Sequence, residues 1–278
     1  MRVRRHSNAR EFLDRAENWL VQSEVENGTL YALARGLLRD DSRYEPPIYL
    51  ATVERDREIL GCVARTPPFP VALSPLPAES IESVLEAVRD VYGSVPGVIG
   101  PKPEATRFAD AWTANSDASW STRFQLRSHT LSEVVIPDPS PSGNLRKATE
   151  SEIGLANRWR EGFERDAGID GLPDFGGRTI GEGKLYFWDD NEPRCMVAST
   201  RDTPNVAWIN TVYTPPEFRG CGYASAAVAA LSQRLLEQGW AFCALYTDLA
   251  NPTSNKIYRR VGYEPVGDAV ELEFSTPD

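Results

Sequence analysis

The feature that most constrains the fold is a pair of glycines between a strand-like run and a helix-like run. Residues 206–213 are rich in β-branched and aromatic side chains, which favours a strand. From residue 224 to residue 235, apolar side chains recur on one helical face, and a second strand-like run follows at 242–247. A strand, a helical crossover and another strand predict a parallel pair of strands.

The turn between strand and helix is suited to hold a phosphate or pyrophosphate. Its residues are Arg219, Gly220, Cys221, Gly222, Tyr223 and Ala224. Glycines allow consecutive N–H groups to point at one concave spot, beside the positive end of a helix dipole. The turn lacks the Gly-Lys-Ser/Thr ending of a P-loop and the three glycines of the dinucleotide fingerprint. Taken alone, it could equally be an ordinary strand-to-helix connection.

A proline- and serine-rich stretch near the midpoint predicts a division into two domains. Residues 137–143 hold three prolines, two serines and a glycine, which is typical of a linker. The elements expected at 1–136 and at 144–278 follow a similar order, which indicates a duplicated architecture. We expect each half to be α+β (mixed α/β), with a mostly antiparallel sheet flanked by helices.

The expected elements of the first half are helices near 11–23, 27–40, 78–92 and 103–115 and strands near 48–53, 59–65, 69–73 and 122–131. Asp56 and Arg57 predict a tight hairpin connection. In the second half, helices are expected near 150–166, after the glycine turn and from Asn251 to Gly262, and strands at 184–188, 194–200 and 263–274. The glycine-rich stretch 170–183 is ambiguous.

Charge and cysteine content narrow the function classes. The net charge of −10 disfavours a nucleic-acid partner, because an acidic chain repels phosphate backbones. No apolar run is long enough to span a membrane, and no apolar stretch follows the basic N-terminus as in a secretory signal. The four cysteines are scattered, which argues against a zinc site or a disulfide framework and favours the cytoplasm. Neither histidine has a partner at metal-ligand spacing.

Two motifs together resemble the GNAT superfamily of acyl-CoA-dependent N-acyltransferases. The family's pyrophosphate-loop pattern, Arg/Gln-x-x-Gly-x-Gly/Ala, is matched by Arg219, Gly222 and Ala224. The family's later Asn, Tyr and Gly-Phe/Tyr positions are matched by Asn251, Tyr258 and the pair Gly262-Tyr263. Two independent motifs at the expected separation are much more specific than either alone. The resemblance is specific over 206–274, and it predicts two GNAT-like halves of which the first is degenerate.

The resemblance implies acetyl-CoA as cosubstrate, with no metal. Backbone N–H groups from Arg219 to Ala224 would bind the pyrophosphate. The pantetheine arm would pair with the strand end near Val212 and Thr214, where the strands of this fold splay apart. Asn251 would contact the cosubstrate from the far side. In the first half, prolines at the equivalent place (74–79) remove N–H donors, so we expect no pyrophosphate site there.

Tyr258 is the expected catalytic residue. A phenol beside the thioester sulfur can donate a proton to the leaving thiolate. The acceptor amine must lose a proton, and many relatives use a Glu on the strand before the loop, where this chain has Asn210 and Thr211. Asp248 and Glu217 are better explained as loop or capping residues, so no base is assigned. Cys221 has no histidine nearby in the sequence, which disfavours an acyl-cysteine route.

The expected function is direct transfer of an acetyl group to a primary amine of a small molecule or protein, with the oligomeric state open. The tandem form also resembles mycothiol synthase, whose acceptor is an amine. Aminoacyl-tRNA-dependent transferases are disfavoured by the intact loop and the acidic charge. The rival from another class is a CoA-binding sensor or scaffold without turnover, which the missing base keeps open.

Overall fold

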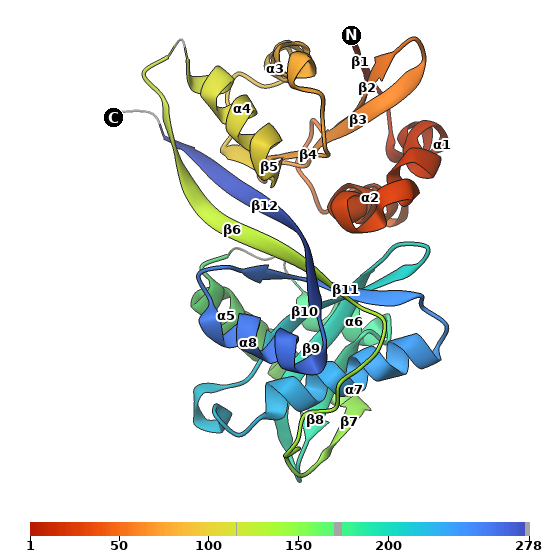
Figure 1. Cartoon of the computed structure of the whole chain (residues 1–278), viewed down its shortest axis with the longest axis vertical. Coiled ribbons are helices and arrows are strands. Elements are labelled where there is room, and N and C mark those ends of the chain that lie inside the picture. The colour runs from red at the N-terminus through yellow and green to blue at the C-terminus, as the bar shows by residue number, and fades with distance from the viewer. Residues whose placement is uncertain (115, 170–173, 276–278) are drawn as a thin grey trace. The chain divides into compact units, whose positions relative to one another are not determined.

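We describe the fold from a computed structural model, over residues 1–114, 116–169 and 174–275 (Figure 1). By its contacts the chain forms two compact units. Unit 1 comprises Met1–Ser128, Asp248–Ala250 and the segment that begins at Val266, and unit 2 comprises His129–Thr247 and Asn251–Pro265. The sequence predicted domains at 1–136 and 144–278. The compact units differ from that division, because the C-terminal strand pairs within unit 1.

Unit 1 is a sheet with helices on both faces. Its strands follow the order β1 (Arg2–Arg5), β2 (Tyr49–Arg55), β3 (Glu58–Arg65), β4 (Val71–Leu73), β5 (Gly97–Pro101), and the parts of β12 (Glu264–Ser275) and β6 (Ser119–Leu131) that belong to this unit. β4 and β5 are parallel, whereas the recorded pairings β1–β2, β2–β3, β3–β4 and β5–β12 are antiparallel. The helices are α1 (Ala9–Leu20), α2 (Glu24–Arg39), α3 (Ile81–Arg89) and α4 (Lys102–Thr113).

The alternation of side chains along the strands sends apolar groups to both faces of this sheet. Leu50 of β2 joins the cluster under α1 and α2, while its neighbours Tyr49 and Ala51 join the cluster under α3 and α4. Val270 and Leu272 of β12 belong to the second cluster. The last strand of the chain therefore completes the core of unit 1.

Unit 2 repeats the plan. Its strands follow the order β11 (Phe242–Asp248), β10 (Val206–Tyr213), β9 (Pro193–Asp202), β8 (Leu185–Asp189) and β7 (Asn144–Lys147). Helices α5 (Ile153–Ala167) and α6 (Phe175–Gly181) share a core with one side of the sheet, and α7 (Tyr223–Glu237) and α8 (Pro252–Val261) with the other. Only the β10–β11 pair is parallel among the recorded pairings of these described strands.

The structure confirms the predicted fold class, a mixed architecture of mostly antiparallel sheets flanked by helices. The predicted parallel pair is also confirmed, since Val206 and Trp208 of β10 pair with Phe242 and Ala244 of β11. Short 3₁₀ turns precede several helices, at Val21–Ser23, Ala78–Ser80, Glu150–Glu152 and Pro216–Phe218. Of the ambiguous stretch 170–183, residues 175–181 form α6, and 170–173 lie outside the described residues. Within the described part of the chain, no helix has the length and apolarity to cross a bilayer.

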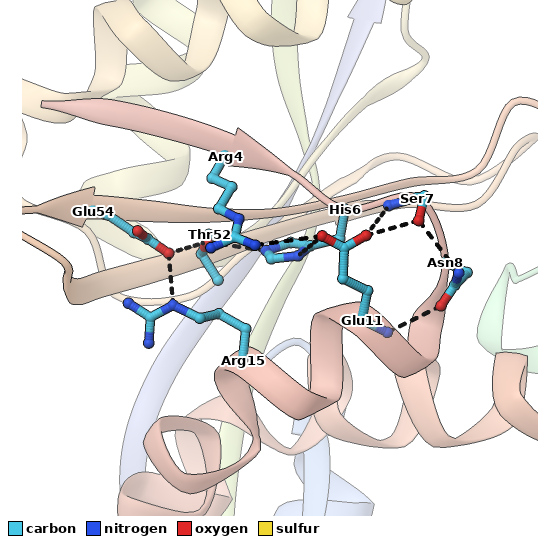
Figure 2. Close-up of polar contacts among 8 residues, drawn as sticks. All are labelled: Arg4, His6, Ser7, Asn8, Glu11, Arg15, Thr52 and Glu54. Carbon is cyan, nitrogen blue, oxygen red and sulfur yellow. Dashed lines mark hydrogen bonds and ion pairs between the residues drawn. The ribbon is translucent and has the colours of Figure 1, made fainter.

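A buried histidine joins the first strands of unit 1 to α1 (Figure 2). Thr52 donates to Glu54 at 2.8 Å, so its hydroxyl accepts from Nε2 of His6 at 3.1 Å. Nδ1 of His6 lies 3.4 Å from the carboxylate of Glu11. Burial lowers the pKa of His6 below its usual 6.5; Arg4 acts in the same direction, while Glu11 and Glu54 oppose the shift.

This histidine predicts a loss of stability in mild acid. A group whose pKa is lower in the folded state binds more protons when unfolded, so its contribution is present above pH 6.5 and is lost as the pH falls. We expect the melting temperature to fall between about pH 7.5 and about pH 5.5, above the range where ordinary carboxylates titrate. Differential scanning calorimetry checks this, with His6→Gln as the control that flattens the slope. An equal slope in both proteins would contradict the assignment.

Candidate functional site

The glycine turn of unit 2 has the geometry of an anion site. After the 3₁₀ turn Pro216–Phe218, the N–H of Arg219 donates to Pro216 O at 3.3 Å. Gly220 and Gly222 then take left-handed φ angles of +81° and +84°. Gly222 is the N-cap of α7 and has no side chain to cap it. The first N–H groups of the helix therefore have no side-chain acceptor.

Six consecutive backbone N–H groups of this turn have no recorded acceptor. The first closed turn of α7 is the bond from Ala226 N to Gly222 O, at 3.1 Å. From Gly220 to Ser225, the described structure records no acceptor for any backbone N–H. Unpaired N–H groups at a helix N-terminus, with the helix dipole behind them, favour an anion. The predicted residues Gly220, Cys221, Gly222, Tyr223 and Ala224 all lie in this turn, and their contact with a cosubstrate stays a prediction.

Arg219 has a structural role in addition to its place in the motif. Its Nε donates to Thr214 O at 2.9 Å, and its guanidinium pairs with Asp166 of α5. The same guanidinium lies 5.9 Å from the centre of the Tyr213 ring. These contacts tie the loop to the end of β10 and to α5, while the N–H of Arg219 stays engaged with Pro216. The sequence did not reveal Asp166, which lies 53 residues away.

The stretch 137–143 lies beside the turn. A Cβ on Gly222 would lie 3.7 Å from Cδ of Pro141, so space for a side chain exists and the φ angle is what requires glycine. The hydroxyls of Ser142 and Tyr223 both donate to Asp190, at 2.8 and 3.0 Å. The side chain of Tyr223 is therefore engaged with the protein, and its backbone N–H is the group directed to the site.

β10 separates from β11 beside the turn, as the resemblance predicted. Parallel pairing covers 206–208 against 242–244, after which β10 runs on to Tyr213 and β11 to Asp248. The register of β10 against β9 shifts twice, before and after Asn210. Thr211 has a left-handed φ of +49°, and Val212 and Thr214 beyond it are half-buried. Near Val212 and Thr214, β10 therefore has no recorded pairing with β11, while Tyr213 still pairs with Met196 of β9.

Tyr258 lies on the inner side of α8. The residue is 8% exposed, and its ring meets that of Tyr263 edge to face, at 6.0 Å between ring centres. Burial is the main cause that raises its pKa above the ordinary value of 10.0, so the phenol keeps its proton at neutral pH. The described structure records no hydrogen-bond partner for its hydroxyl. A protonated, unpaired phenol is what a proton donor requires.

Asn251 has a structural role at the start of α8. Its side-chain oxygen accepts from Ser254 N at 3.1 Å, and Pro252 follows at the first helical position. Its backbone oxygen accepts from Nδ2 of Asn255 at 2.8 Å, and Asn255 in turn accepts from Thr247 of β11 at 2.7 Å. These bonds fix α8 to the end of β11. The predicted contact of Asn251 with the cosubstrate stays a prediction.

The structure adds an arginine that the sequence reasoning missed. Arg160 of α5 donates to Oγ1 of Thr211 at 3.0 Å and to Glu164 at 2.5 Å. The spacing of Arg160 and Glu164 by four residues is a recognisable helical ion-pair signal. Nothing in the sequence indicated that this pair faces β10.

Neither Glu217 nor Asp248 is placed by the structure as a base for the acceptor amine. Glu217 is exposed in the 3₁₀ turn, and Asp248 lies at the end of β11, where its carboxylate accepts from Ala250 N at 2.9 Å. Cys221 is an exposed free thiol, whereas burial raises the pKa of Cys195 and Cys243 to about 12. Among the described residues, no group of three His, Cys, Asp or Glu side chains could hold a metal ion.

Unit 1 contains a corresponding crossover whose turn is filled. α3 connects the parallel strands β4 and β5, as α7 connects β10 and β11. The turn before α3 contains Pro75 and Pro77, which have no N–H, and Ser74 and Ser80 donate their N–H groups to Cys62 and Pro77. Leu76 packs so closely on Gly61 that a Cβ there would lie 2.3 Å from it. This turn offers no row of free donors.

Several solved structures share this fold over nearly the whole chain. A Drosophila protein aligns with a TM-score of 0.70 at 13% identity, over 98% of each chain. A GNAT-family acetyltransferase from Colwellia psychrerythraea aligns at 0.58 and 13% identity, over 99% of this chain and 100% of that one. A tandem GNAT protein from the clavulanic acid biosynthesis pathway aligns at 0.57 and 13% identity, over 99% of each chain.

These identities are low, so the likeness concerns the fold. No curated protein sequence matches the chain. A sequence model described as the acetyltransferase (GNAT) family matches residues 153–263, which include the glycine turn, β10, α7 and α8. Residues 153–263 are thus similar in sequence to the GNAT acetyltransferase family, and the chain as a whole has the fold of a tandem GNAT protein.

Proposed function

We propose that the chain is an N-acetyltransferase that moves an acetyl group from acetyl-CoA to a primary amine in unit 2. The observation that carries this proposal is the row of unpaired N–H groups from Gly220 to Ser225 at the start of α7. A pyrophosphate there would accept several hydrogen bonds and would lie at the positive end of the helix dipole. Unit 1 lacks such a row at the corresponding turn, so we assign the activity to unit 2.

The rest of the cosubstrate would follow β10. Because β10 leaves β11 after Trp208, its backbone near Val212 and Thr214 can pair with the amides of a pantetheine arm, as an added strand would. Gly220, Cys221, Gly222, Tyr223 and Ala224 would contribute N–H groups at the phosphates, and Arg219 would hold the turn in shape. Asn251 has a free side-chain N–H₂ with which to reach the arm from α8.

In the proposed reaction, the amine nitrogen forms a bond to the acetyl carbon and the carbon–sulfur bond breaks. The thiolate that leaves takes the proton of the Tyr258 phenol, which burial keeps protonated. As the amide forms, its nitrogen loses a proton to solvent and Tyr258 is reprotonated from solvent; before attack, a lysine-type ammonium, which titrates near ~10.4, must also lose a proton to solvent. We assign no residue to that step, because β10 carries Asn210 and Thr211 where a carboxylate would stand.

The acceptor is proposed as an amine on a small molecule or a protein. The net charge of −10 favours a cationic, amine-bearing acceptor over a nucleic acid. We also propose a cytoplasmic location, because three of the four cysteines are buried free thiols and the fourth is an exposed free thiol.

An acceptor screen tests the function. The full chain is mixed with acetyl-CoA and a panel of small amines, polyamines, amino acids and lysine peptides, and released CoA thiol is followed optically while calorimetry measures donor binding. We expect donor binding and amine-dependent release of thiol. Tight binding with no release for any amine would favour the sensor that lacks turnover. Absence of donor binding would contradict both functions.

A further inference from the structure

Thr211 lies in a backbone conformation that its side chain disfavours. Its φ is +49°, and a β-branched residue rarely takes a left-handed angle. It is 4% exposed and lies where the register of β10 against β9 is irregular on both sides of Asn210. A conformation of this kind persists only where the surroundings hold it.

A chain of polar contacts holds it. Nη1 of Arg160 donates to Oγ1 of Thr211 at 3.0 Å, and this hydroxyl donates to Oδ1 of Asn210 at 3.2 Å. Nδ2 of Asn210 then donates to the hydroxyl of Thr200 in β9, at 2.8 Å. The contacts run from α5 through β10 into β9, so the irregular segment is attached on both sides.

Arg160 is itself fixed before it reaches Thr211. Its Nε donates to Glu164 at 2.5 Å. Its guanidinium lies 5.3 Å from the ring centre of Phe163 and 5.0 Å from that of Phe175. Its side chain is only 18% exposed. A planar guanidinium that is stacked and paired in this way has little freedom left to lose, so it is a rigid support for the hydroxyl.

We propose that Arg160 is a positioning residue for the acyl donor. By holding Thr211, it keeps β10 turned away from β11 beyond Trp208, so that the backbone at Val212 and Thr214 faces the donor's amides; Thr214 O, which accepts from Nε of Arg219, keeps a second lone pair for them. Arg160 acts through Thr211 and touches no reacting atom. This inference rests on the proposed function, which supplies the donor.

The effect on the donor separates this role from general stabilisation. We expect Arg160→Ala to weaken acetyl-CoA binding by about 10-fold, the size of one hydrogen bond to a charged group, and to raise the donor KM by as much. The amine KM should stay within about twofold. Arg160→Lys, which keeps a cationic donor, should recover part of the affinity. Arg158→Ala, on the same helix, is the matched control and should bind as the wild type does.

A second variant tests the cause. Thr211→Gly removes the hydroxyl and lets the backbone take the left-handed φ without strain, so nothing remains for Arg160 to hold. In that background Arg160→Ala should change donor affinity by less than about twofold, which is the coupling expected of two groups acting as one. Equal effects of Arg160→Ala in both backgrounds would overturn the inference.

A measurement without any donor keeps the two proposals apart. Hydrogen exchange of the free protein should show faster exchange at 212–214 in Arg160→Ala than in the wild type and in Arg158→Ala. If the wild type binds no acetyl-CoA, the proposed function fails, while the exchange result still decides whether Arg160 holds this segment. Unchanged exchange at 212–214, or wild-type donor affinity in Arg160→Ala, would overturn the inference.

Discussion

Replacing Tyr258 with phenylalanine is expected to lower kcat by about 100-fold, the lower end of what a positioned general acid contributes. The ring stays in place between α8 and the sheet, so the packing with Tyr263 is kept. The lost atom is the hydroxyl, whose pKa burial raises so that it holds its proton. Each tenfold loss corresponds to about 1.4 kcal/mol of transition-state free energy.

The measurement is release of CoA thiol at saturating donor and amine, beside calorimetric binding of acetyl-CoA. The dissociation constant for the donor should change by less than about threefold, because the phenol is needed when the thiolate leaves. The residual kcat of Tyr258→Phe should depend on the leaving group. An acyl donor whose thiol is more acidic needs less help from a proton donor, so it should recover part of the lost kcat. Undiminished turnover would remove Tyr258 from the mechanism.

Tyr263 provides a matched control on the neighbouring tyrosine. Its hydroxyl lies 2.8 Å from that of Ser232 in α7, in the core of unit 2. Tyr263→Phe should lower the free energy of unfolding by about 1 kcal/mol, the usual value of one hydrogen bond. Its kcat should equal that of the wild type. The pair of variants separates the loss of a phenol from a general disturbance of α8.

The parts of the fold that were predictable are those with a local cause. Asp56 and Arg57, which both have positive φ, form the two-residue turn between β2 and β3. A turn of this length depends on the conformation of its own two residues and not on distant contacts. The crossover from β10 through α7 to β11 was predictable for the same reason: the glycines, the helical apolar stripe and the following strand are consecutive in sequence.

The parts that could not be predicted depend on contacts distant in sequence. Arg160 and Thr211 are 51 residues apart, and the hydrogen bond between them follows from the packing of α5 on β10. β12 reads as a strand from its alternation, but a strand pattern does not state its partner, and it pairs with β5 near the middle of the first half. The boundary expected at 137–143 rested on composition, which indicates a segment rich in turns. Composition does not indicate that a strand after that segment, β12, packs in the core of unit 1.

Gly222→Val is expected to weaken acetyl-CoA binding by at least about 100-fold, since several charge-assisted hydrogen bonds depend on this one residue. Gly222 has a φ of +84°, and valine, which is branched at Cβ, strongly disfavours that angle. The chain would turn to a negative φ, and the N–H groups on either side would no longer point to one spot. Space is not the obstacle, because Pro141 lies 3.7 Å from the position of a Cβ.

Gly239 is the matched control position, because a valine there would meet the same backbone strain of a positive φ at the opposite end of α7. It follows the other end of α7 and has a φ of +97°, and a Cβ added to it would meet no atom within 4 Å. Gly239→Val should therefore lower the melting temperature to a similar degree while leaving the donor's dissociation constant unchanged. Calorimetry on both variants distinguishes a lost anion site from a destabilised helix. Equal donor affinity in Gly222→Val and Gly239→Val would show that the turn at Gly222 does not bind the pyrophosphate.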